Sequence, residues 1–161
     1  RSRAASEWDK GQPRVHTELM LKHFGVNVVV EELSDGGRSI RVAGGQRLTA
    51  RNVVVPADIS SAAFPLVAAL LVPGSEITLP NIGVNPLRTG LLDALALMGA
   101  DIERENQRTE AGEPVCDLRV TASDLRGAAI PASLAPPMLY EYPILAAVSY
   151  THLSRQTTYP P

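Results

Sequence analysis

The chain has 161 residues, of which 45% are hydrophobic, and its formal net charge is −2. This length and composition suffice for one sizeable core or two small ones, and they are not typical of a disordered protein. The slightly acidic balance, with no concentrated basic face, argues against a general nucleic-acid binder or a protein of anionic membrane surfaces.

Apolar runs and cysteine usage narrow the class further. No apolar run reaches the ~18 residues of a spanning helix, and Pro65 interrupts the best candidate, residues 62–72. We therefore expect a cytoplasmic location without membrane contact. The single cysteine, Cys116, excludes an intrachain disulfide and a cysteine-cluster metal site, and its alternating run predicts a buried thiol. The three histidines have no partner at ligand spacing, so no metal site is predicted.

Residues 1–13 are polar and lack a hydrophobic period, so we expect a leader outside the fold.

Two segments of the chain share one pattern. RVHTELMLKHFG (14–25) and RTGLLDALALMG (88–99) then each place a glycine eleven residues after an arginine, and an extended run follows each glycine. A period of about 75 residues exceeds that of ordinary solenoids, so each copy should be a small α/β layer.

The first copy predicts a helix, a hairpin and a closing strand. The helix should span residues 16–24, with Gly25 at positive φ as its C-cap. Residues 26–33 and 38–42 should pair as antiparallel strands across a turn at 34–37. The run 52–56 has the apolar, β-branched composition of a buried strand.

The stretch between the two copies predicts a second helix. It should cover residues 62–72, be buried on most sides, and tolerate Pro65 because that residue lies near its start. Asp58, Ser60 or Ser61 can cap its first turn. A strand at 76–79 should follow. In the second copy, the run 116–120 should repeat the strand at 38–42, and a β-type run at 129–131 should close the copy.

Four motifs in the middle of the chain carry a resemblance to a known family. They are VPADISSAAFPLVAALLVPGS (55–75), NPLRTGLL (85–92), MGADI (98–102) and GEPVCDLRV (112–120). Together they resemble the 5-enolpyruvylshikimate-3-phosphate synthase family, specifically its bacterial glyphosate-tolerant type. The resemblance begins at Arg14 and fades after Val148, so it implies an internal fragment of the family's full length.

The resemblance implies an incomplete α/β architecture built from repeated βαβαββ-type units, the inside-out α/β fold of enolpyruvyl transferases. Residues 14–55 would be the last unit of one lobe and residues 56–148 the first part of the other. Residues 149–161 would be a tail outside the family, as residues 1–13 would be a leader.

The activity implied is that of a 3-phosphoshikimate 1-carboxyvinyltransferase of the shikimate pathway, on the route to chorismate and the aromatic amino acids. Its enolpyruvyl group comes from phosphoenolpyruvate, its acceptor is shikimate 3-phosphate, and it needs no cofactor. Arg14 matches the arginine of the family's Arg-Asp-His-Thr-Glu motif, which contacts the substrate phosphate, although Val15 replaces the aspartate.

The family's catalytic base is absent from the matching position. Where the family has Met-Ile-Asp-Glu-Tyr-Pro, this chain has MLYEYP (138–143), so Tyr140 replaces the aspartate that accepts the hydroxyl proton. A tyrosine is neutral at pH 7 and a poor base, and Glu141 is the one candidate substitute. The resemblance therefore implies no retained catalytic residue and a fragment that is inactive alone.

Two alternatives remain open at the level of sequence. The chain could belong to a related enolpyruvyl transferase that acts on a UDP-sugar. It could also be a noncatalytic α/β repeat module that binds a protein partner.

Overall fold

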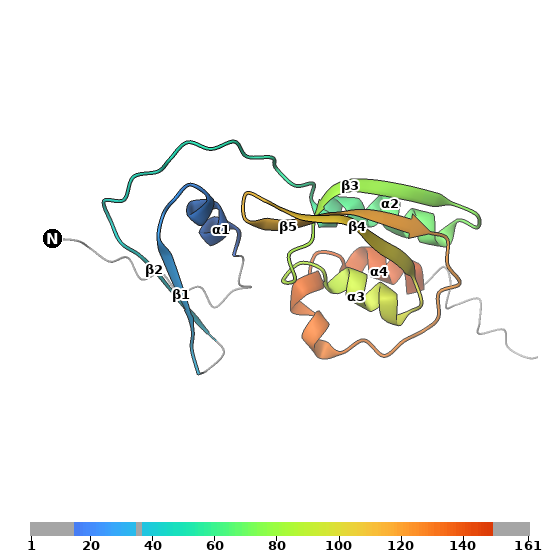
Figure 1. Ribbon diagram of the computed structural model, residues 1–161. Coiled ribbons are helices and arrows are strands. Elements are labelled where there is room, and N and C mark those ends of the chain that lie inside the picture. Colours follow the sequence, from blue (N-terminus) through green and yellow to red (C-terminus); the bar gives the residue numbers. More distant parts are fainter. Residues whose placement is uncertain (1–14, 35–36, 150–161) are drawn as a thin grey trace, which may run out of the picture. The chain divides into compact units, whose positions relative to one another are not determined.

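A computed structural model describes residues 15–34 and 37–149 (Figure 1). The chain divides into two compact units. One contains Arg1–Val55 with the short segment Thr109–Glu113, and the other contains Pro56–Arg108 and the residues from Pro114 onward. We refer to them as unit 1 and unit 2. In the described part of the chain, no helix is long and apolar enough to cross a membrane.

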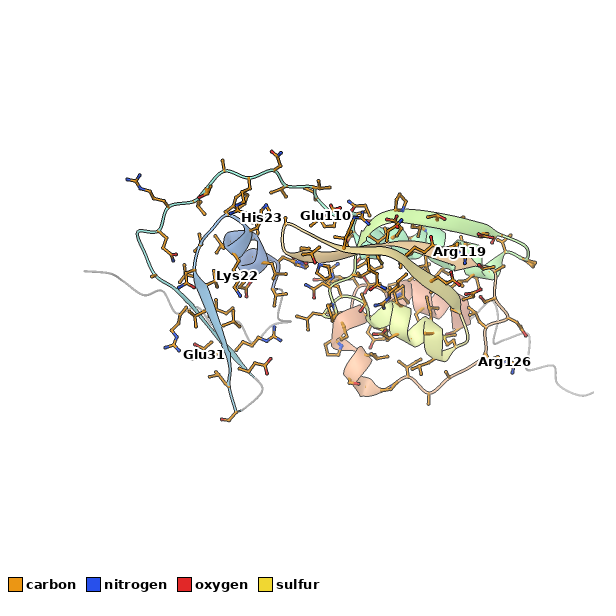
Figure 2. The ribbon with its side chains drawn as sticks, viewed as in Figure 1. Lys22, His23, Glu31, Glu110, Arg119 and Arg126 are labelled. Atoms are coloured by element: carbon orange, nitrogen blue, oxygen red, sulfur yellow. The ribbon has the colours of Figure 1, made fainter. Side chains whose placement is uncertain are left out.

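Unit 1 consists mainly of a short helix and a hairpin. Helix α1 spans His16–His23, and the basic residues Lys22 and His23 lie in its last turn (Figure 2). Strands β1 (Val28–Glu32) and β2 (Arg38–Val42) pair in antiparallel fashion. The predicted helix and hairpin are confirmed, while the predicted leader and part of the turn at 34–37 lie outside the described residues.

Helix α1 ends at a glycine with positive φ, as the sequence predicts. Gly25 has φ +89°, and its N–H donates to the carbonyl of Lys22 at 3.0 Å. The N–H of Val26 donates to the carbonyl of Leu21, also at 3.0 Å. These two bonds form a Schellman motif, which satisfies carbonyls at the helix end and needs a left-handed residue at its turn. No residue of α1 is buried.

The apolar run at residues 53–55 is not a strand, and the prediction of a buried closing strand there is wrong. Val55 is 79% exposed, and Val53 and Val54 are exposed as well. Residues 129–131, the second predicted closing run, are also irregular. A strand requires a neighbour that completes its hydrogen-bond ladder, and β-branched composition alone does not provide one.

Unit 2 contains most of a three-stranded sheet in the order β3-β5-β4, of which only the segment Thr109–Glu113 belongs to unit 1 (Figure 1). The strands are β3 (Glu76–Gly83), β4 (Asp101–Glu110) and β5 (Glu113–Thr121), and β3 and β5 are antiparallel. A two-residue turn joins β4 to β5, with φ of 51° at Ala111 and 88° at Gly112. Positive φ at both positions is typical of the turns that match the twist of a hairpin.

The three helices and two 3₁₀ turns among the described residues of unit 2 share one core with one face of this sheet. The helices are α2 (Ile59–Leu71), α3 (Gly90–Leu97) and α4 (Tyr142–Val148), and the turns are η1 (Ala132–Leu134) and η2 (Pro136–Met138). The shared core includes fully buried side chains of both layers: Leu66, Leu70, Leu91, Leu95, Cys116, Leu118 and Val120. Burial raises the pKa of the Cys116 thiol, as expected for a structural cysteine.

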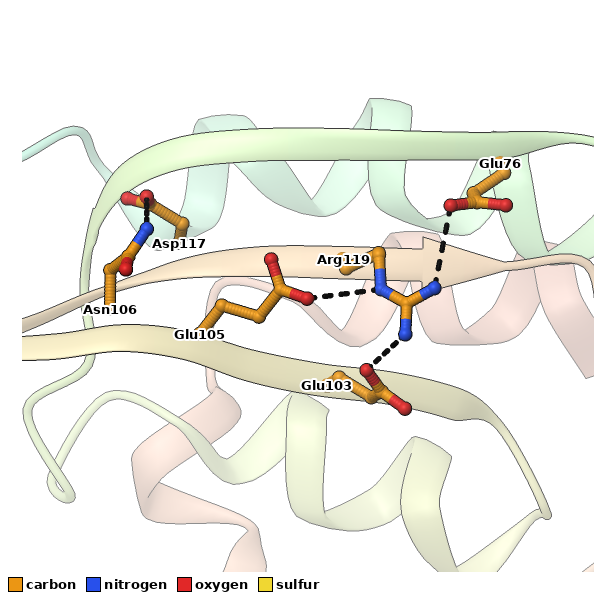
Figure 3. A network of polar contacts seen from close by, with 6 residues as sticks. All are labelled: Glu76, Glu103, Glu105, Asn106, Asp117 and Arg119. Carbon is orange, nitrogen blue, oxygen red and sulfur yellow. Dashed lines mark hydrogen bonds and ion pairs between the residues drawn. The ribbon is translucent and has the colours of Figure 1, made fainter.

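The opposite face of the sheet carries a network of charged and polar side chains (Figure 3). Arg119, on the central strand, donates to Glu76 on β3 and to Glu103 and Glu105 on β4. The hydrogen bond to Glu103 and the neighbouring negative charges raise the pKa of Arg119 further above its ordinary value. This face is polar because successive side chains of a strand alternate between the two faces.

Helix α2 begins three residues earlier than predicted. Its N-cap is Asp58, whose Oδ2 accepts the N–H of Ser61 at 2.9 Å. Pro65 therefore lies inside the helix rather than near its start, and it leaves the carbonyl of Ser61 without the usual intrahelical donor. One face of α2 is buried, whereas Phe64 on the other face is 64% exposed.

Helix α3 ends with the same motif as α1. Gly99 has φ +88°, its N–H donates to the carbonyl of Ala96, and the N–H of Ala100 donates to the carbonyl of Leu95, both at 3.0 Å. A hairpin again follows. The two copies thus share helix, cap and hairpin, and the predicted repeat is confirmed in secondary structure.

Candidate functional site

The residues predicted to carry function fall in different parts of the chain. Arg14 lies outside the described residues. His16 contacts Glu113 at 2.5 Å within unit 1, and the ring of His23 contacts the carbonyl of Asn52 at 3.1 Å. Among the described residues, no group of three or more His, Cys, Asp or Glu side chains is arranged to hold a metal ion. Tyr140 and Glu141 lie in unit 2, just before α4.

A turn anchored by Asn85 sets the position of Arg88. Asn85 is 4% exposed, and its side-chain oxygen accepts the N–H of Leu87 at 3.0 Å. Its carbonyl accepts the N–H of Arg88 at 2.8 Å. An asparagine that bonds the backbone two residues ahead is a common way to start such a turn. Arg88 therefore lies at the end of this turn, immediately before α3.

From that turn the Arg88 guanidinium reaches the first turn of α2. Its Nη2 donates to Ser60 Oγ at 2.8 Å and to Asp58 Oδ1 at 3.2 Å. Ser60 Oγ in turn donates to Glu141 Oε1. We call these four residues, Asp58, Ser60, Arg88 and Glu141, the Arg88 cluster. It joins the starts of α2, α3 and α4.

Tyr140 and Glu141 are adjacent in sequence but lie in opposite environments. Glu141 is 3% exposed, and its carboxylate is engaged with Ser60. Tyr140 is 57% exposed, and its ring centroid lies 5.9 Å from the central carbon of the Arg88 guanidinium. A side chain at position 140 is therefore displayed at the surface of unit 2 beside a fixed positive charge.

The electrostatics of Asp58 reflect its two tasks in this cluster. Partial burial is the largest single influence and raises the pKa of its carboxyl group, whereas hydrogen bonds from the hydroxyl and N–H of Ser61 lower it. The N–H of Ser60 and the charge of Arg88 add to the lowering, and the pKa of Asp58 lies below its ordinary value. Asp58 thus caps α2 as an anion and pairs with Arg88.

The loop that leads to position 140 lies close against the start of α3. A Cβ atom placed on Gly90 would be 2.9 Å from the carbonyl oxygen of Leu134 and 3.0 Å from the nitrogen of Met138. Both are backbone atoms that cannot move aside independently. A glycine is therefore required at position 90 for the 3₁₀ turns to approach so closely.

Part of this arrangement was predicted from the sequence. Asp58 was one of three predicted caps, but Ser60 and Ser61 do not cap α2: Ser61 provides the capped N–H, and Ser60 links Arg88 to Glu141. Arg88, which begins the second copy of the pattern as Arg14 begins the first, belongs in the structure to a cluster beside position 140. Residues separated by 28 and 81 positions form this cluster, so no local periodicity signals it.

Comparison with known proteins identifies the family. Residues 8–151 match the family described as "EPSP synthase (3-phosphoshikimate 1-carboxyvinyltransferase)". The chain is 61% identical over 136 residues to a 3-phosphoshikimate 1-carboxyvinyltransferase from Paramagnetospirillum magneticum, covering 84% of this chain and 30% of that relative. It is 54% identical over 143 residues to one from Methylorubrum populi, covering 88% of this chain and 32% of the relative.

A solved structure agrees with the sequence comparison. An EPSP synthase from Acinetobacter baumannii matches with a TM-score of 0.81 at 39% identity, over 88% of this chain and 31% of that chain. The chain therefore belongs to the EPSP synthase family, and the predicted incomplete α/β fold of this family is confirmed. It spans about 30% of the length of the curated relatives it matches.

Proposed function

We propose that this chain forms part of a 3-phosphoshikimate 1-carboxyvinyltransferase. The complete enzyme would transfer the enolpyruvyl group of phosphoenolpyruvate to the hydroxyl of shikimate 3-phosphate and release phosphate. The observation that carries the proposal is the 61% identity over 136 residues with a relative of that name. A cytoplasmic location and the absence of nucleic-acid or membrane partners belong to the same proposal.

Within that enzyme the chain would supply one wall of the substrate site. Arg14 is the proposed contact of the shikimate phosphate, because a guanidinium can give a phosphate two hydrogen bonds. Position 140 is the proposed place of the general base. In this chain it holds Tyr140, whose neutral phenol is a poor proton acceptor at neutral pH. Glu141 is a weak substitute, because its carboxylate is buried and accepts a hydrogen bond from Ser60.

A chimera tests this proposal directly. Residues 14–148 of this chain would replace the matching segment of the Paramagnetospirillum magneticum relative, with either Tyr140 or Tyr140→Asp. Phosphate release from phosphoenolpyruvate would be measured in the presence of shikimate 3-phosphate. We expect the Tyr140→Asp chimera to be active and the Tyr140 chimera to turn over about 10²–10⁴-fold more slowly, the usual contribution of a positioned base.

The 161-residue chain alone provides the second test of the proposed function. It should release no phosphate above a no-protein control, and Tyr140→Asp should not change that, since one carboxylate cannot hold two anionic substrates. A folded Tyr140→Asp chimera without activity would overturn the proposed function. Equal activity of the two chimeras would instead overturn the role assigned to position 140 and make Glu141→Gln the next variant to measure.

A further inference from the structure

We propose that Arg88 and Ser60 are positioning residues, which fix the place of the side chain at position 140 and favour the ionised form of a carboxylic acid at that position. The inference rests on the proposed function, because that function gives position 140 its role. It concerns residues of unit 2 alone, and the contacts that carry it are those of the Arg88 cluster.

The hydrogen bonds of the cluster can run in only one direction. A guanidinium only donates hydrogen bonds, an ionised carboxylate only accepts them, and a hydroxyl can do both. Ser60 accepts from Arg88 Nη2 at 2.8 Å and donates to Glu141 Oε1, so its only donor is used on Glu141 and one of its lone pairs on Arg88. An alanine at position 60 would remove both bonds, whereas a threonine would keep the hydroxyl.

The hydrogen bond from Ser60 fixes Glu141 and, with it, the neighbouring residue 140. Glu141 is 3% exposed, and a buried carboxylate without a hydrogen bond is strongly unfavourable, so its side chain is held at Ser60. Its backbone is held on both sides, since its N–H donates to Met138 and its carbonyl accepts from Leu145, each at 3.0 Å. Residue 140 is consequently presented outward from a constrained turn.

Arg88 also acts on position 140 directly. Its guanidinium carbon lies 5.9 Å from the Tyr140 ring centroid, a distance at which a cation attracts an aromatic face weakly and a carboxylate more strongly. The other charged groups of the cluster, Asp58 and Glu141, are carboxylates and reduce the net positive field. Arg88 should still favour the ionised form of an acid at position 140, because it is the group next to that side chain.

The test uses the 161-residue chain carrying Tyr140→Asp. The midpoint of ionisation of the introduced carboxyl group would be followed by carbon NMR, with and without Arg88→Gln. We expect Arg88→Gln to raise that midpoint by about half a pH unit, the effect of one charge about 6 Å away at the dielectric constant of water. Arg88→Lys keeps the charge and should restore most of the shift.

Arg126→Gln is the matched control. It removes the same charge from the exposed loop after β5 (Figure 2), so it reports the effect of net charge alone and should leave the midpoint unchanged. Ser60→Ala should raise the midpoint by less than Arg88→Gln does, and Ser60→Thr should preserve it. Equal shifts for Arg88→Gln and Arg126→Gln, or no shift for either, would overturn the proposal.

A second readout covers variants that fail to fold in the isolated chain. In the Tyr140→Asp chimera, Arg88→Gln should move the acid limb of the kcat profile to higher pH, and Arg126→Gln should not. A purely structural role of Arg88 would lower kcat equally at every pH, which would also overturn the proposal. Because the NMR titration needs no turnover, its failure is distinguishable from a failure of the proposed function.

Discussion

The two copies of the repeated unit have the same local structure but very different burial. Helices α1 and α3 are both eight residues long and both end in a Schellman motif with a glycine near φ +90°. No residue of α1 is buried, whereas five of the eight residues of α3 are: Gly90, Leu91, Leu92, Ala94 and Leu95. The same contrast separates β2, which has no buried residue, from β5, which has four.

This difference separates what neighbouring residues determine from what distant residues determine. A helix end depends on hydrogen bonds among residues within one turn, so the same sequence signal gives the same cap in both copies. Burial depends on partners, and in unit 2 these come from α2, α4 and the sheet. Mutations at equivalent positions of the two copies should therefore have unequal effects in the core and equal effects at the caps.

The largest expected difference is at equivalent leucines. Leu95→Ala removes a side chain that is fully buried and should lower the free energy of unfolding of unit 2 by about 2–5 kcal/mol. Leu21→Ala, the matching change in α1, removes a partly exposed side chain and should lower stability by about 1 kcal/mol or less. Urea unfolding, followed separately for each unit by NMR, would measure both.

Leu97→Ala serves as the control within α3. Leu97 is 53% exposed, so its truncation tests whether any leucine loss in this helix is harmful. We expect an effect within about 0.5 kcal/mol of zero. Equal losses for Leu21→Ala and Leu95→Ala would contradict the proposed contrast between the copies.

A second difference is expected at the helix starts, where Gly90 corresponds to His16. Gly90→Ala should lower stability by about 1–3 kcal/mol, because the added methyl group would overlap the backbone of residues 134–138. Helix propensity alone predicts the opposite sign, a gain of about 1 kcal/mol. Thermal unfolding of Gly90→Ala, with His16→Ala as the matched change in α1, decides between these predictions.

The elements that the sequence predicted correctly are those whose signals are local. The caps at Gly25 and Gly99, the hairpin after α1 and the strand that begins at Glu76 depend on turn chemistry and alternation within a few residues. The prediction of a strand at 53–55 failed for the complementary reason. Three valines favour an extended chain, but whether a strand forms depends on a neighbour elsewhere in the sequence.

The candidate site shows the same limit. The family resemblance identified position 140 from its sequence neighbours, but the environment of that position comes from Ser60 and Arg88, which are remote in sequence. The inward orientation of Glu141 also required the structure, since a one-residue difference decides which side chain is buried. A glutamate next to an apolar helix start gives no sequence signal of burial.

The caps should respond alike in both copies. Gly25→Ala and Gly99→Ala each force an alanine into a left-handed conformation, which costs roughly 1–2 kcal/mol. An added Cβ finds nothing within 4 Å at Gly99, and only the Thr49 hydroxyl at 3.7 Å at Gly25, so crowding adds little. We expect losses that agree within about 0.5 kcal/mol, measured by urea unfolding. Asparagine at either position should cost less, because it tolerates positive φ.

The smallest expected effect concerns the hairpins and depends on pH. In the hairpin of unit 1, Glu32 pairs with Arg38 at the surface, and such exposed pairs contribute little. In unit 2, by contrast, Asp117 on the central strand accepts the N–H of Asn81 at 2.8 Å. It also accepts the side-chain amide of Asn106 at 2.8 Å (Figure 3). Asn81 and Asn106 have φ of 57° and 46°, so Asp117 holds a left-handed residue on each neighbouring strand.

Acid should therefore weaken the sheet of unit 2 through Asp117. The hydrogen bond from the Asn81 backbone, followed by that from Asn106 and the pairing with Arg108, lowers the pKa of Asp117 below its ordinary value. A carboxyl group whose pKa is lowered in the folded state stabilises the fold fully above its pKa in the unfolded chain, which is about 3.9. This contribution is lost as the pH falls through the pKa of the folded state. Asp117→Asn should lower the urea midpoint at pH 6 and show a smaller further decrease by pH 3 than the parent chain.

Asp124→Asn, on the exposed loop after β5, controls for the loss of one negative charge and should keep the parent's pH dependence. If Asp117→Asn also kept it, the hydrogen bonds of Asp117 would not stabilise the sheet, and the left-handed conformations of Asn81 and Asn106 would not depend on Asp117.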